Sequence, residues 1–120
     1  MKPRTVLVAA AVLVAVGLLW VSRRDAGDPQ AGAAIKIGFI VKQPEEPWFQ
    51  FEWRFAEEAA SEYGFELVKI GASDGEKVLA AIDNLAASGA QGFVICTPDV
   101  QLGPAIVARA KSHGLKLVSV

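Results

Sequence analysis

Two kinds of apolar pattern alternate along residues 35–120. Four short runs rich in Val, Ile, Leu and Phe are nearly continuously apolar, as expected for strands buried on both faces of a sheet. These runs are residues 35–41, 65–70, 92–96 and 115–120. Between them, apolar residues recur every three or four positions, which is the period of a helix with one packed face. The pattern therefore predicts a chain of alternating strands and helices.

The first helical segment has an apolar stripe and an acidic outer side. The predicted stripe consists of Phe49, Trp53, Ala56, Ala60 and Tyr63. The outer side carries Glu57, Glu58 and Glu62. This arrangement predicts an amphipathic helix that packs on the sheet.

Signals at the ends of the helical segments define a repeat. Asp74 is a predicted N-cap for a helix over about residues 75–88, and Pro104 suits the first turn of a helix that begins near Gly103. The predicted inward positions of these two helices are Val78, Ile82, Leu85, Ile106, Val107 and Ala110. Each of the three helical segments is followed by a glycine, a common stop signal, at a spacing of 25 residues. These glycines are Gly64, Gly89 and Gly114.

This order of elements predicts an α/β fold with a Rossmann-like parallel sheet. Strands that are joined through helices run parallel with right-handed crossovers, and ligands of such sheets bind outside the carboxyl ends of the strands. Candidate chemistry is therefore expected directly after each strand.

The loop after the first strand is rich in groups that suit a sugar. Residues 42–49, Lys-Gln-Pro-Glu-Glu-Pro-Trp-Phe, place a cation, two carboxylates and two aromatic rings within eight positions. The two prolines restrict the backbone, so the side chains can be held in place before a ligand arrives. Lys42 can donate hydrogen bonds to hydroxyl groups and Glu46 can accept them. Trp48 or Phe49 can cover the apolar C–H face of a sugar ring.

Simpler roles remain open for the same residues. Lys42 and Glu46 could form an exposed ion pair of little energetic value. Trp48 and Phe49 could anchor the start of the helix, and Phe49 is the stronger candidate for the core because it begins the apolar stripe.

Residues near the other strand and helix ends also have simple interpretations. Cys96 fits a small, buried, apolar side chain. Thr97 and Asp99 follow the third strand, where they could face the same crevice, although such residues before a helix more often form turns and caps. His113, in the last turn of a helix, fits a favourable contact with the helix dipole.

The amino terminus has the composition of an export signal. Two basic residues precede the apolar run from Val6 to Val21, and two arginines close it. We interpret residues 1–24 as a signal peptide cleaved at the small residues 31–34, or as a retained membrane anchor, because the run is near the lower length limit for spanning a bilayer. Residues 25–34, rich in Asp, Gly, Pro, Gln and Ala, are the predicted linker to a domain over 35–120.

Composition narrows the classes of function. The 120 residues are 52% hydrophobic and 21% charged, which suits one small globular domain. Residues 35–120 hold eight basic and eleven acidic side chains, a net charge of −3, which disfavours a nucleic-acid partner. One cysteine and one histidine cannot provide an internal disulfide or, at their spacing, a metal cluster. Glycine-rich phosphate loops and nucleophile motifs are missing from the sequence, so we predict no cofactor and no enzyme activity.

Four sequence segments, in their order and spacing, carry a family resemblance. They are KIGFIVKQPEEPWFQ at 36–50, DGEK at 74–77, AIDNLAASGA at 81–90 and GFVICTPD at 92–99. These segments resemble the start of the periplasmic L-arabinose-binding proteins, type I periplasmic binding proteins that serve as sugar-binding components of ABC importers. The resemblance implies two Rossmann-like lobes joined by a hinge, which close on a monosaccharide without changing it chemically.

The resemblance also implies which residues contact the ligand. The family's sugar-contacting lysine, glutamate, tryptophan and phenylalanine correspond to Lys42, Glu46, Trp48 and Phe49, and its pocket cysteine corresponds to Cys96. Two consecutive aspartates, the hinge and the second lobe of the family would follow residue 120. We therefore expect a partial first lobe that binds a sugar weakly or not at all, with its last strand at the sheet edge and apolar surface exposed.

The expected function is that of a periplasmic substrate-binding protein, monomeric at full length, that captures L-arabinose or a related aldose such as galactose. Its expected partner is the membrane permease of an ABC importer. One alternative is the extracellular sugar-sensing domain of a membrane-anchored receptor, which retention of residues 5–22 would favour. Another is a fragment of an α/β enzyme with catalytic groups further along the chain. A cytoplasmic repressor is disfavoured, because an apolar run stands where a helix-turn-helix domain would be needed.

Overall fold

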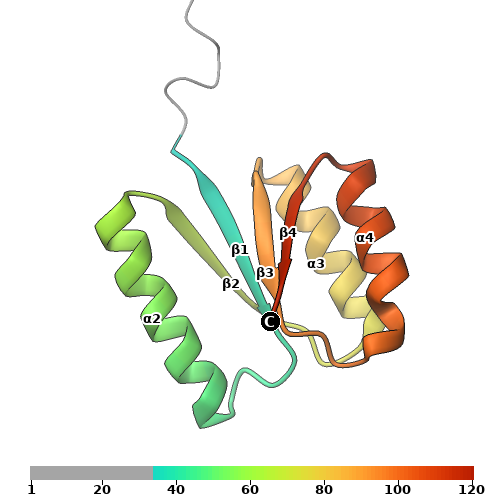
Figure 1. Cartoon of the computed structure of the whole chain (residues 1–120), viewed down its shortest axis with the longest axis horizontal. Helices are drawn as coiled ribbons and strands as arrows, with labels where there is room; N and C mark the ends of the chain where they lie inside the picture. The colour runs from blue at the N-terminus through green and yellow to red at the C-terminus, as the bar shows by residue number, and fades with distance from the viewer. Residues whose placement is uncertain (1–33) are drawn as a thin grey trace, which may run out of the picture. The chain divides into compact units, whose positions relative to one another are not determined.

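The computed structural model describes residues 34–120 as alternating strands and helices (Figure 1). In chain order these are β1 (Lys36–Val41), α2 (Pro47–Tyr63), β2 (Glu66–Gly71), α3 (Gly75–Ala87), β3 (Gly92–Ile95), the 3-10 helix η1 (Val100–Leu102), α4 (Gly103–Ser112) and β4 (Lys116–Ser119). Every strand and helix expected from the sequence is present, with small differences at the ends. The interpretation of residues 1–24 as signal peptide or anchor, and nearly all of the linker 25–34, lie outside the described residues. Among residues 34–120, no helix combines the length and apolar character needed to cross a bilayer.

The four strands form one parallel sheet in the order β2-β1-β3-β4. This confirms the predicted parallel α/β fold. The expectation that all four strands are buried on both faces is wrong for the two outer ones. Glu66 and Lys69 in β2 and Lys116 and Val118 in β4 are exposed, because an edge strand has a neighbour on one side only. The expected exposed apolar surface on the last strand is confirmed, since Val118 is 57% exposed.

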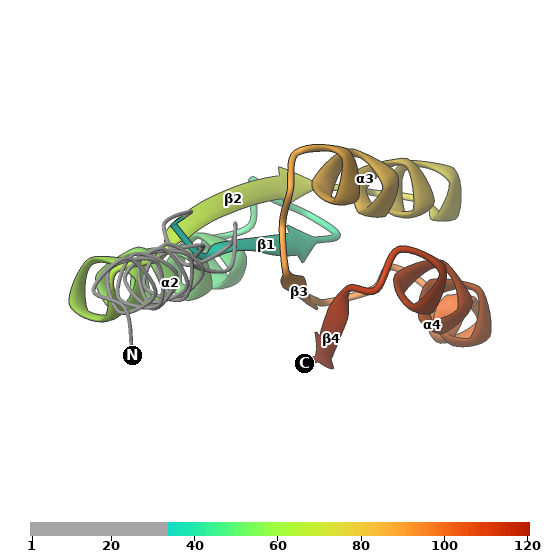
Figure 2. The same ribbon diagram turned by 90° about the horizontal axis from the view of Figure 1, so that it is seen from above.

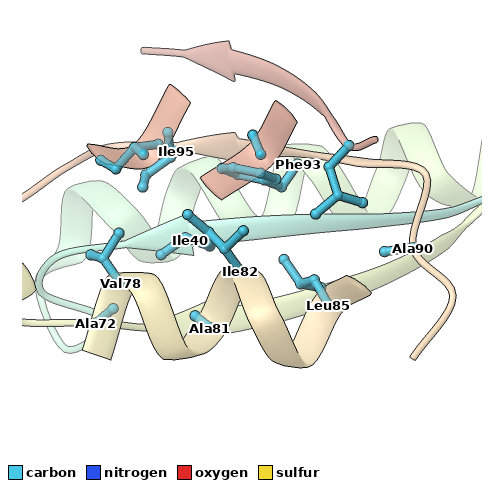
Figure 3. Close-up of a cluster of buried hydrophobic side chains, with 12 residues drawn as sticks. Ile40, Ala72, Val78, Ala81, Ile82, Leu85, Ala90, Phe93 and Ile95 are labelled. Atoms are coloured by element: carbon cyan, nitrogen blue, oxygen red, sulfur yellow. The ribbon is translucent and has the colours of Figure 1, made fainter. Parts of the chain in front are cut away.

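Helices α3 and α4 cover one face of the sheet and build the larger core (Figures 1 and 3). Its largest buried side chains include Ile40, Val78, Ile82, Leu85, Phe93, Ile95 and Ile106. Gly38 lets α3 approach β1 closely, because a Cβ at this position would collide with the side chain of Leu85. The predicted inward positions of both helices are confirmed except for Val107. This residue is exposed because it lies about 100° around the helix from the buried Ile106.

Helix α2 lies on the opposite face, next to β1 and β2 (Figure 2). Phe49 and Trp53 pack there against Phe39 and Val41, and the Trp53 indole N–H donates to the Phe39 carbonyl oxygen at 3.3 Å. The prediction that Tyr63 belongs to this packed face is wrong, since it is exposed. Fourteen residues after Phe49, the helix is about 40° short of four full turns, which moves Tyr63 off the packed stripe.

The predicted helix ends are confirmed by their backbone geometry. Asp74 caps α3, with its side chain accepting a hydrogen bond from the Lys77 backbone N–H at 2.9 Å. Gly64, Gly89 and Gly114 have φ angles of 72°, 80° and 67°, a left-handed conformation that glycine adopts without strain. The 25-residue spacing therefore marks the ends of three helices.

Candidate functional site

The loop between β1 and α2 lies at the carboxyl ends of the strands and is held by local contacts. The Glu46 backbone N–H donates to the Gln43 carbonyl at 3.0 Å, and the Gln50 side-chain amide donates to the Pro44 carbonyl. The Pro44 ring lies against the end of β2, where a Cβ on Gly71 would be 2.6 Å from its Cγ. The proline therefore fixes the loop against the neighbouring strand.

A pocket of about 700 Å³ lies beside this loop. It is lined by Lys42, Gln43, Pro44, Glu45, Gly71, Ser73, Lys77 and Pro98. These residues come from the carboxyl end of β2 and the segments that follow β1, β2 and β3, where a parallel sheet is expected to hold a ligand. Of the five residues expected to contact a ligand, only Lys42 belongs to this lining. Its ammonium group and the nearby Glu45 carboxylate offer hydrogen-bond donors and acceptors suited to hydroxyl groups.

Ser73 and Lys77 line the pocket although neither was predicted from the sequence. Lys77 Nζ donates to Ser73 Oγ at 2.9 Å and is also 2.9 Å from Asp74 Oδ2. The backbone hydrogen bond from Lys77, followed by its side-chain hydrogen bond, lowers the pKa of Asp74, so this carboxylate stays ionised and holds the ammonium group in place. The signal was present in the sequence, because Ser73 follows the second predicted strand as Lys42 follows the first.

Glu46 and Trp48 lie at the exposed start of α2, outside the pocket lining. Glu46 is the N-cap residue, and its side chain makes no capping hydrogen bond. Trp48 is 70% exposed, and its indole N–H donates to Glu52 Oε1 at 3.0 Å. The alternative of Trp48 as a buried anchor is therefore wrong. Within residues 34–120, no ion pair joins Lys42 to Glu46.

Phe49 and Cys96 both contribute to the packing on the face of the sheet that carries α2. Phe49 is 5% exposed and belongs to the buried cluster with Val41 and Trp53, against which Cys96 packs. Cys96 is a free cysteine that is only partly buried. The interpretation of Phe49 as a core residue is confirmed, because it holds the start of α2 on the sheet. Ligand contact by Phe49 and Cys96 stays a prediction.

Three other polar residues near the strand and helix ends have structural roles. The Asp99 carboxylate accepts from the Gln101 backbone N–H at 2.8 Å and caps η1, and Thr97 Oγ1 donates to the Asp99 carbonyl at 3.0 Å. The turn and capping interpretation of these two residues is confirmed. His113 Nε2 lies 2.7 Å from Asp83 Oδ1 in α3, so this histidine ties two helices together. The part of the chain that the structure describes holds no cluster of three His, Cys, Asp or Glu side chains suited to a metal ion.

Sequence comparison identifies close similarity to sugar-binding proteins. Residues 34–120 match the model of a family described as periplasmic binding proteins and sugar binding domain of the LacI family. The chain is 56% identical over 108 residues, 90% of its length, to the L-arabinose-binding periplasmic protein of Escherichia coli strain K12. It is 52% identical over 114 residues, 95% of its length, to the ABC transporter L-arabinose-binding periplasmic protein of Azospirillum brasilense. The chain spans 32% of the length of each of these relatives.

Solved structures share the fold. An ABC transporter solute binding protein from Mycobacterium smegmatis, with bound glycerol, has a TM-score of 0.66 at 27% identity over 73% of this chain and 31% of its own. An arabinose binding protein from Geobacillus stearothermophilus has a TM-score of 0.64 at 16% identity over 72% of this chain and 31% of its own. The second similarity shows the fold alone.

Proposed function

Because the chain belongs to the family of periplasmic binding proteins and LacI-type sugar-binding domains, we propose that it captures a monosaccharide, namely L-arabinose or a related aldose such as galactose. The observation that carries this proposal is the 56% identity over 108 residues to a relative named for L-arabinose binding. The pocket at the carboxyl ends of the strands supports it, because its lining combines ammonium, amide, carboxylate and hydroxyl groups.

In this proposal the sugar lies at the ends of β1 and β3 and meets five side chains. Lys42 donates from the pocket wall, and the exposed Glu46 accepts from hydroxyl groups. Trp48 covers the apolar face of the sugar ring. Its exposed position at the start of α2 leaves the indole accessible to the sugar. Phe49 and Cys96 form the apolar floor beneath.

The sugar is passed on chemically unchanged to the membrane permease of an ABC importer. This part of the proposal rests on the relatives, whose names give a periplasmic location and, in one case, an ABC transporter. A periplasmic location also agrees with the export-signal composition of residues 1–24.

Nuclear magnetic resonance titration of the chain with L-arabinose tests the proposal, because it detects weak binding residue by residue. We expect shifts at the amides of Lys42, Glu46, Trp48 and Cys96. Lys42→Met removes the ammonium donor and is expected to abolish these shifts while the fold persists. Lys111→Met, a matched change at an exposed lysine of α4, is expected to leave them intact.

Two results would contradict the proposed function. One is the absence of shifts at every sugar concentration in the chain extended through both lobes of the family, because the partial lobe by itself is expected to bind weakly or not at all. The other is a set of equal shifts in the Lys42→Met and Lys111→Met variants on titration with L-arabinose, which would show that the Lys42 ammonium group takes no part in binding.

A further inference from the structure

The exposed indole of Trp48 is held by a side chain of its own helix. Its Nε1–H donates to Glu52 Oε1 at 3.0 Å. Residues four apart in a helix lie on the same face, and their side chains lean toward the amino-terminal end of the helix. Glu52 therefore leans toward Trp48, at the end of α2 that begins beside the carboxyl ends of the strands (Figure 1).

The Glu52 carboxylate lies in an unfavourable place for a charged group. Its side chain is half-buried, one turn before Ala56, which packs against the buried cluster under α2. The atom Oε2 is buried and has no hydrogen-bond partner in the part of the chain that the structure describes. Nor does Glu52 form an ion pair within residues 34–120. A buried acceptor without a donor lowers stability, so the hydrogen bond to Trp48 is the contact that explains a carboxylate at this position.

Trp48 has little other support for one fixed orientation. Its side chain is 70% exposed, whereas the neighbouring Phe49 is anchored in the core. A side chain that moves freely must be ordered when a ligand binds, and this ordering lowers the affinity. A hydrogen bond to a charged acceptor is stronger than one between neutral groups, so the carboxylate can order the indole before a ligand arrives.

We propose that Glu52 is a positioning residue for sugar binding, whose carboxylate holds the Trp48 indole in the orientation that covers the sugar ring. The role of Glu52 rests on the proposed function and extends it to a residue outside the five expected ligand contacts. Without the carboxylate the indole has to be ordered during binding, so the affinity falls although every direct sugar contact is still available. Glu52 acts through one group, the indole N–H of Trp48.

Nuclear magnetic resonance of the 120-residue chain tests the contact in the absence of sugar. The indole N–H signal of Trp48 is assigned by its loss in Trp48→Phe. Glu52→Ala is expected to move this signal upfield and to speed its exchange with water, because the acceptor is removed. Glu52→Gln keeps an acceptor oxygen at the same reach and should largely retain the signal. Glu58→Ala, a matched change at an exposed residue of the same helix, should leave it unchanged.

Calorimetric titration with L-arabinose tests the effect on binding in the chain extended through both lobes of the family. Glu52→Ala should raise the dissociation constant about two- to tenfold, as expected when one more side chain is ordered on binding. Glu52→Gln and Glu58→Ala should bind nearly as the unchanged protein does. In a Trp48→Phe background, which has no indole N–H, Glu52→Ala should have no further effect. Circular dichroism checks that each variant is folded.

Three results would overturn the positioning role. The first is an unchanged Trp48 signal or an unchanged affinity in Glu52→Ala, which would leave the proposed function intact. The second is an equal loss of affinity from Glu52→Ala in the Trp48→Phe background, which would assign Glu52 to packing or to direct sugar contact. The third is the absence of L-arabinose binding by the unchanged protein, which would contradict the proposed function as well.

Discussion

Trp48 and Phe49 are adjacent in the sequence and lie in opposite environments. Trp48 is exposed at the start of α2 and contacts Glu52, whereas Phe49 is buried against Val41 and Trp53. Adjacent residues of a helix point about 100° apart, so one can face a ligand while the other faces the core. Substitution of Trp48 can therefore test binding with little effect on packing, whereas Phe49 packs in the core as well as forming the proposed floor of the site.

We predict that Trp48→Ala weakens sugar binding and changes the free energy of unfolding by less than about 0.5 kcal/mol, as for an exposed side chain. Phe49→Ala is the matched comparison and should cost about 3–5 kcal/mol, because it opens a cavity in the core. Urea unfolding measures the stability of both variants, and sugar titration measures the binding of the folded ones. A similar loss of stability in the two variants would indicate that Trp48 contributes to core packing.

At the scale of elements, helices α3 and α4 are joined through one carboxylate. Asp83 in α3 accepts a hydrogen bond from Arg109 Nη1 at 2.6 Å, and its other oxygen lies 2.7 Å from His113 Nε2. The hydrogen bond from His113, followed by that from Arg109, lowers the pKa of Asp83 in the folded chain. The ionised carboxylate therefore favours the folded state, in which α3 and α4 pack side by side.

This contact predicts how stability depends on pH. Folding lowers the pKa of Asp83, so its ionised carboxylate stabilises the folded state. This stabilisation is complete above the unfolded-state pKa of about 4 and is lost as the pH falls through the folded-state pKa. Thermal unfolding between neutral and strongly acidic pH should show a smaller loss of stability for Asp83→Asn than for the unchanged chain. Glu76→Gln is a control in the same helix, at a side chain without an ion pair in residues 34–120, and should keep the full acid dependence. Parallel curves for Asp83→Asn and the unchanged chain would refute this role.

At the scale of the whole molecule, the candidate pocket exists only in the folded chain. Its walls come from segments that follow three different strands, with Lys42, Ser73 and Pro98 far apart in the sequence. The parallel order β2-β1-β3-β4 brings the ends of these strands to one edge of the sheet. A ligand of this pocket therefore binds the folded state and stabilises it by mass action.

L-arabinose is predicted to stabilise the chain against urea. At ten times the dissociation constant the gain is about 1.4 kcal/mol, which moves the unfolding midpoint without changing the slope of the transition. Lys42→Met should lose this shift and Lys111→Met should keep it. An identical shift in Lys42→Met would indicate a general solvent effect of the sugar instead of binding at the pocket.

The elements and their ends were predictable because their causes are local. Apolar period, the Asp74 cap and the glycines that end the helices act within a few residues, and each appears in the fold as expected. Ligand contact by the five predicted residues stays a prediction. The loop at 42–49 lies at the strand ends as expected, whereas the presence of Ser73 and Lys77 in the pocket lining was not predicted. Composition of a loop does not reveal which side chains meet, because their partners come from distant strands.

The sequence by itself determined the alternation of strands and helices, the parallel α/β class and the position of the polar loop after β1, since periodicity and turn chemistry decide these features locally. The last strand was expected at an edge of the sheet, and only the tertiary structure decided that β2 is the other edge, that Ser73 and Lys77 share a pocket with Lys42, and that Tyr63 and Val107 face outward. These outcomes depend on strand order and on the precise angle at which each helix meets the sheet. Both are set by contacts between residues far apart in the chain, which no local pattern contains.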